Sequence, residues 1–216
     1  MARMLRRTLL AALLAAPAAA AVTPGAAWAQ QPTIDRAAIT RIEAYLNGLR
    51  AMRARFLQTA QNGASAQGTA WISRPGRMRF DYDPPEPMLL VASGGQVMMF
   101  DRELRQPSVA PASATPLGLL LRPEIRLSGD ITVVGTERSG GFLRVTIFRT
   151  AASAEGRLTL AFQEEPTFEL RQWAVLDAQG RLTRVTLTEI DTTVRPDNRI
   201  FDFNDPRFLD QQTMQR

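Results

Sequence analysis

The 216-residue chain contains no cysteine, no histidine and no lysine. Without cysteine there are no disulfides, and without cysteine or histidine the usual nitrogen and sulfur ligands of zinc are missing. The same absences exclude a Ser-His-Asp triad and a cysteine nucleophile, and the missing lysine excludes Ser-Lys chemistry. We therefore expect no catalytic residue, no metal site and no cofactor, and we regard a hydrolase as a remote interpretation.

An adjacent acidic pair, Glu164 and Glu165, is the remaining candidate for acid and base catalysis. A glycosidase needs two carboxylates on either side of one bond. Neighbouring residues of a strand point to opposite faces, and Pro166 follows directly. We interpret the pair as the solvated end of a strand.

All basic side chains are arginines, and their excess over acids is small. The formal charge of the whole chain is +5, but residues 1–29 contain three arginines and no acid, so the remainder carries +2. An excess of two positive charges, scattered among 21 acidic residues, does not form the basic patch that binds a phosphate backbone. We therefore expect no nucleic-acid partner.

Residues 1–29 have the pattern of a secretory signal peptide. Arg3, Arg6 and Arg7 form a basic segment, residues 9–14 are apolar, and Ala27-Trp28-Ala29 is a small-x-small cleavage site. The apolar part is too short, and too interrupted by proline, to span a bilayer, which takes about 20 residues. We expect residues 30–216 to form one soluble domain outside the cytoplasm. Arg6-Arg7 leaves the twin-arginine route open beside general secretion.

The exported part predicts one helix followed by a large sheet. Residues 34–52 carry an apolar stripe at helical spacing, with Thr33 or Asp35 available as N-cap. Residues 77–82 then alternate polar and apolar, as a strand does. Similar strand segments occur at 56–61, 68–73, 88–92, 96–102, 131–137, 142–148, 157–162, 170–176 and 182–190.

A Pro/Ala/Ser-rich loop is expected at 108–116, followed by a short apolar helix at 117–121. Roughly ten short strands joined by Gly and Pro turns indicate an antiparallel meander that must curl or be covered. The fold class we predict is mainly β (α+β): one strongly curved antiparallel sheet, an unclosed β-barrel, with helices as a lid over an apolar concave face. Methionines on that face would suit a ligand pocket, although ordinary core packing is the more common explanation for them.

The segment from Trp71 to Tyr82, with Pro84-Pro85 and residues 90–97 after it, resembles the LolA family of periplasmic lipoprotein carriers. Flanking segments are similar in the same order: residues 52–58, the Thr-Pro helix at 115–121, and Phe201-Asp202-Phe203 with Pro206 as a closing strand. The resemblance implies a half-barrel lidded by helices. It also implies a ligand, the acyl chains of outer-membrane-directed lipoproteins.

The resemblance further implies partners and site residues. The partners would be an inner-membrane ABC transporter that releases lipoproteins and an outer-membrane acceptor lipoprotein, and we expect a monomer. Arg74 would latch the lid to the sheet by donating to backbone carbonyls, where an isolated arginine is more often a solvated strand-end charge. The pocket candidates are Met78, Phe80, Trp71 and Met99. The lid candidates are Leu46, Leu49, Leu117 and Leu120.

Other functions remain open on the sequence. A related half-barrel would bind a different lipid, such as a hopanoid or glycolipid, or act as an envelope sensor. A structural envelope protein with a fully packed interior is another class, and it would take up no apolar dye.

Overall fold

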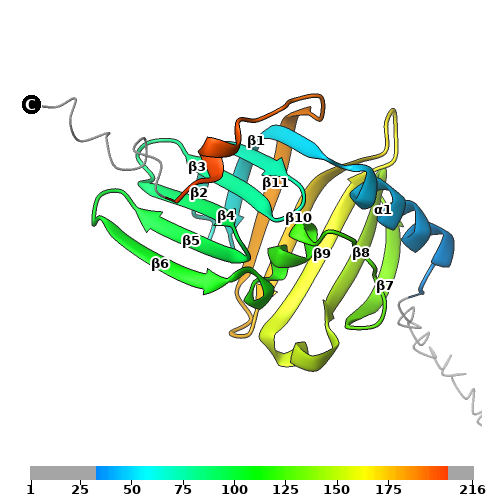
Figure 1. Cartoon of the computed structure of the whole chain (residues 1–216). Coiled ribbons are helices and arrows are strands. Elements are labelled where there is room, and N and C mark those ends of the chain that lie inside the picture. The colour runs from blue at the N-terminus through cyan, green and yellow to red at the C-terminus, as the bar shows by residue number, and fades with distance from the viewer. Residues whose placement is uncertain (1–32, 204–216) are drawn as a thin grey trace, which may run out of the picture. The chain divides into compact units, whose positions relative to one another are not determined.

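The computed structural model describes residues 33–203 (Figure 1). The expected signal peptide and Pro206 lie outside the described residues. None of the described helices is both long and apolar enough to cross a membrane.

Eleven strands form a single antiparallel sheet, in the order β6-β5-β4-β3-β2-β1-β11-β10-β9-β8-β7. Within the described residues β6 and β7 are the two ends of this order, so the sheet is an unclosed barrel. The strands are β1 (Ala51–Ala60), β2 (Ser65–Ser73), β3 (Arg77–Tyr82), β4 (Met88–Ser93), β5 (Gln96–Asp101), β6 (Gln106–Pro111), β7 (Ile131–Ser139), β8 (Phe142–Arg149), β9 (Gly156–Gln163), β10 (Glu169–Asp177) and β11 (Leu182–Asp191).

Helical elements cover the concave side, as the sequence predicted. Figure 1 shows α1 (Arg36–Gly48) at the β7–β9 half of the curved sheet and the 3-10 helix η2 (Pro116–Leu121) between that half and β4–β6. Asp35 caps α1, accepting a hydrogen bond from the Ala38 amide, and Thr115 caps η2 in the same way. The remaining 3-10 helices are η1 (Ala112–Ala114), η3 (Thr150–Glu155) and η4 (Asn198–Phe201).

One apolar core joins the cover to both halves of the sheet. Ala38, Ile42 and Leu46 repeat at intervals of four along α1, so they share one face, and all three are buried. They belong to the same cluster as inward residues of β2 and β3 and of β8 and β9. Burial of this shared apolar surface is the main source of stability of the fold.

Three elements differ from the prediction. Helix α1 ends at Gly48, and Met52, expected in the helix, is a buried residue of β1. An apolar residue at the helix exit satisfies the helical and the strand period equally, so the pattern placed the boundary too late. The expected loop at 108–116 begins with strand β6, whose six residues are all exposed. Pro107 and Pro111 are tolerated because β6 is an edge strand.

The third difference concerns the closing strand. Residues 198–201 form η4, and the expectation of a strand at 201–203 is wrong. Asp197 accepts a hydrogen bond from the Arg199 amide at 2.9 Å, which caps a helical turn. Phe201 is then buried against Leu89 and Val91, on the face of the sheet opposite to the main core.

The strand glycine Gly68 gives a test of how closely the concave face is packed. Its register partner Phe56 lies over it, and an added Cβ would overlap the Asp81 carbonyl and lie 2.7 Å from Phe56 Cε1. We expect Gly68→Ala to lower the free energy of unfolding by about 1–3 kcal/mol, as overpacking does. Urea denaturation measures the change.

The matched control is Gly48→Ala, because a Cβ at Gly48 meets no atom within 4 Å. This variant should be neutral or slightly stabilising, since alanine is the better helix former. Equal stabilities for the two variants would contradict the packing described at Gly68.

Candidate functional site

Arg74 stands at the corner between β2 and β3 and reaches toward the cover. Its guanidinium donates hydrogen bonds to the carbonyl oxygen of Leu46, in the last turn of α1, and to that of Arg122, just after η2, at 2.6 Å. A longer contact of 3.5 Å reaches the Pro123 carbonyl. Helix-end carbonyls have no partner within their own helix, so one planar, multiply donating side chain satisfies several of them.

Backbone hydrogen bonds strengthen the same corner. The Arg74 amide donates to the Arg50 carbonyl at 2.8 Å, and the Gly76 amide donates to the Leu121 carbonyl at 2.9 Å. Burial lowers the pKa of the Arg74 guanidinium, and the nearby positive charge of Arg50 lowers it further. Arginine starts from so high a pKa that the group keeps its charge at neutral pH.

The two covering elements are also tied to each other. The side-chain amide of Asn47 on α1 donates to the Ile125 carbonyl at 2.9 Å and accepts from the Ile125 amide at 2.8 Å. Glu43, one turn earlier, accepts from the Leu127 amide at 2.6 Å. We call α1 and residues 116–127 together the cover, since these bonds make them one hydrogen-bonded unit.

The other end of α1 is held by ion pairs. Asp35 pairs with Arg138 of β7 at 2.6 Å, and Arg41 pairs with Glu164 at 3.2 Å. Hydrogen bonding to Arg138 holds the pKa of the Asp35 carboxyl below its usual value. Glu164 follows the end of β9, and its contacts are arginines, in keeping with the strand-end interpretation.

The structure brings most of the predicted pocket and lid residues into the interior. Met78 and Phe80 are 1% and 4% exposed and belong to the main core, with Leu46, Leu49 and Leu120. Leu117 is half-buried and packs against this core. Phe80 makes edge-to-face contacts with Phe56 and Trp173, at centroid distances of 5.0 and 5.9 Å. Burial raises the pKa of Tyr82, beside this cluster, to about 12.

Two of the pocket predictions have a different outcome. Met99 shares the face of Phe80, because Phe80 pairs with Leu90 and Leu90 with Met99, but it is 46% exposed near the sheet edge. The prediction for Trp71 is wrong. Trp71 pairs with Arg79 on the opposite face and packs with Leu89, Val91 and Phe201. Alternation shows which residues of one strand share a face, but not how two strands are aligned. The register between β2 and β3 puts Trp71 on the convex face, opposite to Phe80.

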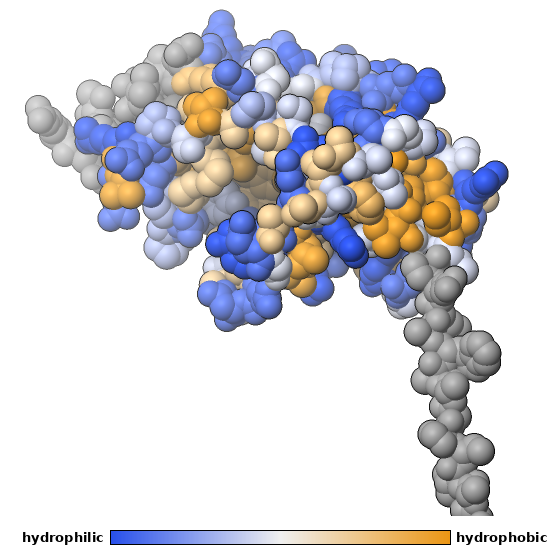
Figure 2. All heavy atoms as spheres, turned by 90° about the horizontal axis from the view of Figure 1, so that it is seen from below, coloured by the Kyte–Doolittle hydropathy of each residue, from blue (hydrophilic) through white to orange (hydrophobic). Residues whose placement is uncertain are grey.

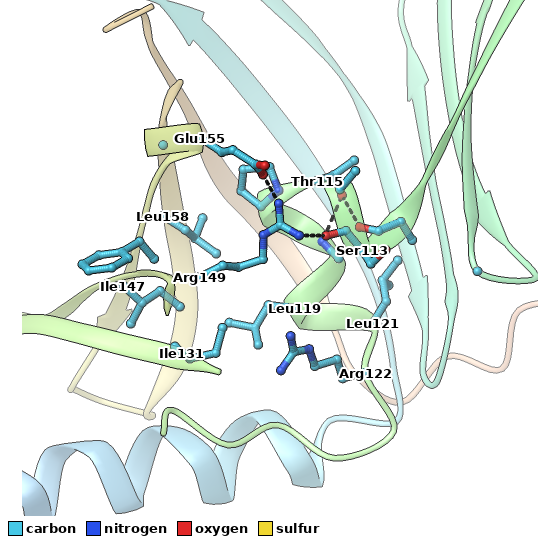
Figure 3. A pocket seen from close by; sticks show the side chains of 17 residues that line it. Ser113, Thr115, Leu119, Leu121, Arg122, Ile131, Ile147, Arg149, Glu155 and Leu158 are labelled. Carbon is cyan, nitrogen blue, oxygen red and sulfur yellow. Dashed lines mark hydrogen bonds and ion pairs between the residues drawn. The ribbon is translucent and has the colours of Figure 1, made fainter. Parts of the chain in front are cut away.

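A cavity of about 370 Å³ lies under η2, toward the open side between β6 and β7 (Figure 3). Its volume is within the range of small-molecule sites, about 300–1,000 Å³. Figure 3 shows side chains from η2 and from β7, β8 and β9 converging on it. The apolar ones are Leu119, Leu121, Ile131, Ile147 and Leu158. Seen from below in Figure 2, the molecule is hollowed between its halves, with apolar residues along the hollow.

The predicted pocket and lid side chains do not line this cavity. Met78, Phe80, Trp71 and Met99 are absent from its wall, and the leucines of η2 that face it are Leu119 and Leu121 rather than Leu117 and Leu120.

Charged residues that the sequence reasoning missed surround the cavity. Arg149 forms an ion pair with Glu155 of η3 and donates to the Ser113 carbonyl of η1 at 2.5 Å, as the dashed lines in Figure 3 show. Arg122 pairs with Asp130 at 2.6 Å, and hydrogen bonding to Arg122 lowers the pKa of that carboxyl. These contacts join residues up to 36 positions apart, and no local pattern in the sequence indicates them.

The arrangement is suited to holding an apolar molecule. The cavity wall is largely aliphatic and continuous with the core, and the cover above the interior is fastened by hydrogen bonds to a few backbone carbonyls. Among residues 33–203 no three acidic side chains are grouped so that they could hold a metal ion.

The family follows from a comparison with known proteins. A family model described as outer membrane lipoprotein carrier protein LolA matches residues 47–204. The chain belongs to the LolA family. The matched region contains every described strand of the sheet, the Arg74 corner and η2, and thus the site just described apart from most of α1.

Individual relatives of LolA type are similar over most of their length. A protein from Methylococcus capsulatus named outer-membrane lipoprotein carrier protein is 26% identical over 88% of this chain and 94% of its own. A protein of the same name from Pseudomonas aeruginosa is 26% identical over 82% and 88%. A solved LolA superfamily protein from Nitrosomonas europaea has a TM-score of 0.41 and 10% identity, covering 76% of this chain and 97% of that one.

Asn47 allows a test of the bonds within the cover. In Asn47→Ala both backbone groups of Ile125 lose their partner, and we expect a loss of about 1–3 kcal/mol in the free energy of unfolding. We also expect faster uptake of an apolar dye, because only the Glu43–Leu127 hydrogen bond then ties residues 122–127 to α1. Urea denaturation and stopped-flow fluorescence measure the two effects.

Thr40→Ala is the control on the same helix, since Thr40 is exposed and donates only to the Arg36 carbonyl of its own helix. If both variants took up dye at the wild-type rate, the bonds between α1 and residues 122–127 would have no part in closing the interior.

Proposed function

We propose that this protein is a periplasmic chaperone that binds the acyl chains of lipoproteins released from the inner membrane and delivers them to an outer-membrane acceptor. The observation that supports this most directly is an apolar cavity beneath a cover that one arginine fastens to the sheet. Membership of the LolA family supports the same ligand class.

The energetics of acyl chains explain why such a carrier is useful. Each buried CH₂ is worth about 0.8 kcal/mol, so a sixteen-carbon chain is worth roughly 12 kcal/mol. Release into water at that cost is too slow for transport. Cargo must therefore pass directly from one apolar cavity to another.

This scheme assigns no enzymatic role to the protein. Loading and delivery make and break no covalent bond, so we propose neither an activity nor a cofactor. The partners are an inner-membrane ABC transporter as the source and an outer-membrane acceptor lipoprotein as the destination, with the carrier acting as a monomer.

For cargo to enter and leave, the cover must open at a low free-energy cost. A hydrogen bond to a charged group contributes about 1.5–3 kcal/mol, so breaking the Arg74 contacts costs a small part of what one buried acyl chain supplies. Within this proposal Arg74 is the latch, Met78 and Phe80 are interior residues exposed by opening, and the leucines of α1 and η2 move with the cover.

A transfer assay tests the proposal. Inner-membrane vesicles holding a labelled lipoprotein are incubated with the mature protein, and soluble one-to-one complexes are isolated and then offered outer membranes. We expect wild type to load and deliver. We expect Arg74→Leu to load but to retain cargo, with delivery reduced at least about tenfold, because losing the latch favours the open, loaded state.

Arg157→Leu is the control, since Arg157 is exposed and lies away from the Arg74 corner. It should load and deliver like wild type. Failure of wild type to release any lipoprotein would refute the carrier function, and a hopanoid or glycolipid extracted from the purified protein would favour the alternative ligand.

A further inference from the structure

A second, polar groove borders the Arg74 corner on the side away from the cavity. It has a volume of about 590 Å³. Arg74 forms part of its wall, with Arg50 at the exit of α1 and Arg195 in the segment after β11. The remaining wall consists of small or polar residues and a proline: Ala51, Ser73, Thr192, Thr193, Val194 and Pro196. Three arginines therefore line the same groove.

The positive charge in this groove is not neutralised. Arg50 and Arg195 are both exposed, and neither takes part in a salt bridge or side-chain hydrogen bond with the residues that the structure describes. The acid at the end of β11, Asp191, is engaged elsewhere, since it accepts from the Thr193 amide at 2.8 Å and from its hydroxyl at 2.7 Å. By contrast, Arg122 and Arg138, which also lie near α1 and η2, each have a carboxylate partner.

The groove is mechanically linked to the latch. Arg50 and Arg74 are joined by a backbone hydrogen bond of 2.8 Å, and the Arg74 side chain spans from the groove to the Leu46 and Arg122 carbonyls. A carboxylate binds a guanidinium through a bidentate, charge-assisted pair that is roughly twice as strong as a neutral hydrogen bond. An acid in the groove would compete with those carbonyls for Arg74.

We propose that this groove, formed by Arg50, Arg74 and Arg195, receives an acidic segment of a partner protein that exchanges cargo with the carrier, and that its binding releases the cover. The inference rests on the proposed carrier function and deepens it, because it couples opening to docking. By linkage, a segment that binds the open state more tightly shifts the protein toward it by that difference in affinity.

The shape and composition of the groove favour a protein segment over a membrane surface. Surfaces that lie on membranes combine basic residues with apolar side chains that enter the lipid. None of the large exposed apolar residues of the described chain lines this groove. A concave site also fits a protruding loop better than a flat bilayer.

The test uses fluorescein-labelled hexaglutamate as the acidic probe and the mature protein, with binding followed by anisotropy. We expect Arg50→Gln/Arg195→Gln to bind at least about tenfold more weakly than wild type, with the affinity of wild type falling as salt is raised. The charge-matched control is Arg157→Gln/Arg184→Gln, at exposed positions outside the groove, and it should stay within about twofold of wild type. Hexaglutamate should also accelerate uptake of phenylnaphthylamine by wild type, but not by the groove variant.

Several results would overturn the inference. They are no binding to wild type, equal weakening in both double variants, or binding without faster dye uptake. Phosphatidylglycerol vesicles that bind wild type but not the groove variant, and displace hexaglutamate, would assign the groove to a membrane instead. Since lipoprotein release by wild type is measured separately, failure here with release intact refutes the groove alone, whereas failure of release refutes the carrier function.

Discussion

The contact between one guanidinium and the backbone carbonyls of the cover is the interaction on which the closed structure depends. The sheet is open between β6 and β7, so its concave face must be covered by other parts of the chain. Helix α1 and residues 116–127 do this as one hydrogen-bonded unit, and Arg74 fastens both parts to the β2–β3 corner. Burial of apolar surface stabilises the closed cover strongly, but the hydrophobic effect has no directional preference. The hydrogen bonds of Arg74 are directional, so they fix the position of the cover on the sheet.

The interior is divided between packed and open parts. Under α1 the space is filled, since Tyr45 packs edge-to-face on Phe162 and Phe168, whereas the cavity lies under η2. A long acyl chain would enter this cavity and then displace the cover from the packed part. Methionine and aromatic side chains lose little when a similar apolar surface replaces their neighbours, so the exchange of core contacts for ligand contacts is nearly balanced. In the mechanism we propose, the polar contacts of Arg74 then decide which state is populated.

The sequence allowed much of this to be predicted because the strands alternate regularly. Residues 77–82 keep a period of two without a break, and the family resemblance in the same region predicted that Arg74 donates to backbone carbonyls of the lid. Face assignment was harder, because alternation cannot say which side is concave, and Trp71 was assigned to the wrong face. The exposed strand β6 and the contacts of Arg149 depend on backbone pairing and long-range proximity, which composition does not encode.

The central claim is that Arg74 holds the cover closed, and a distance measurement across the corner tests it most directly. Because the chain has no cysteine, Ala44→Cys on α1 and Gln96→Cys on β5, both exposed, give two unique spin-label sites. The account predicts a single narrow distance distribution by double electron–electron resonance in the empty protein. It predicts a longer, broader distribution when Arg74→Leu is added, similar to that of the lipoprotein-loaded wild type. An unchanged distribution in the Arg74→Leu protein would contradict it.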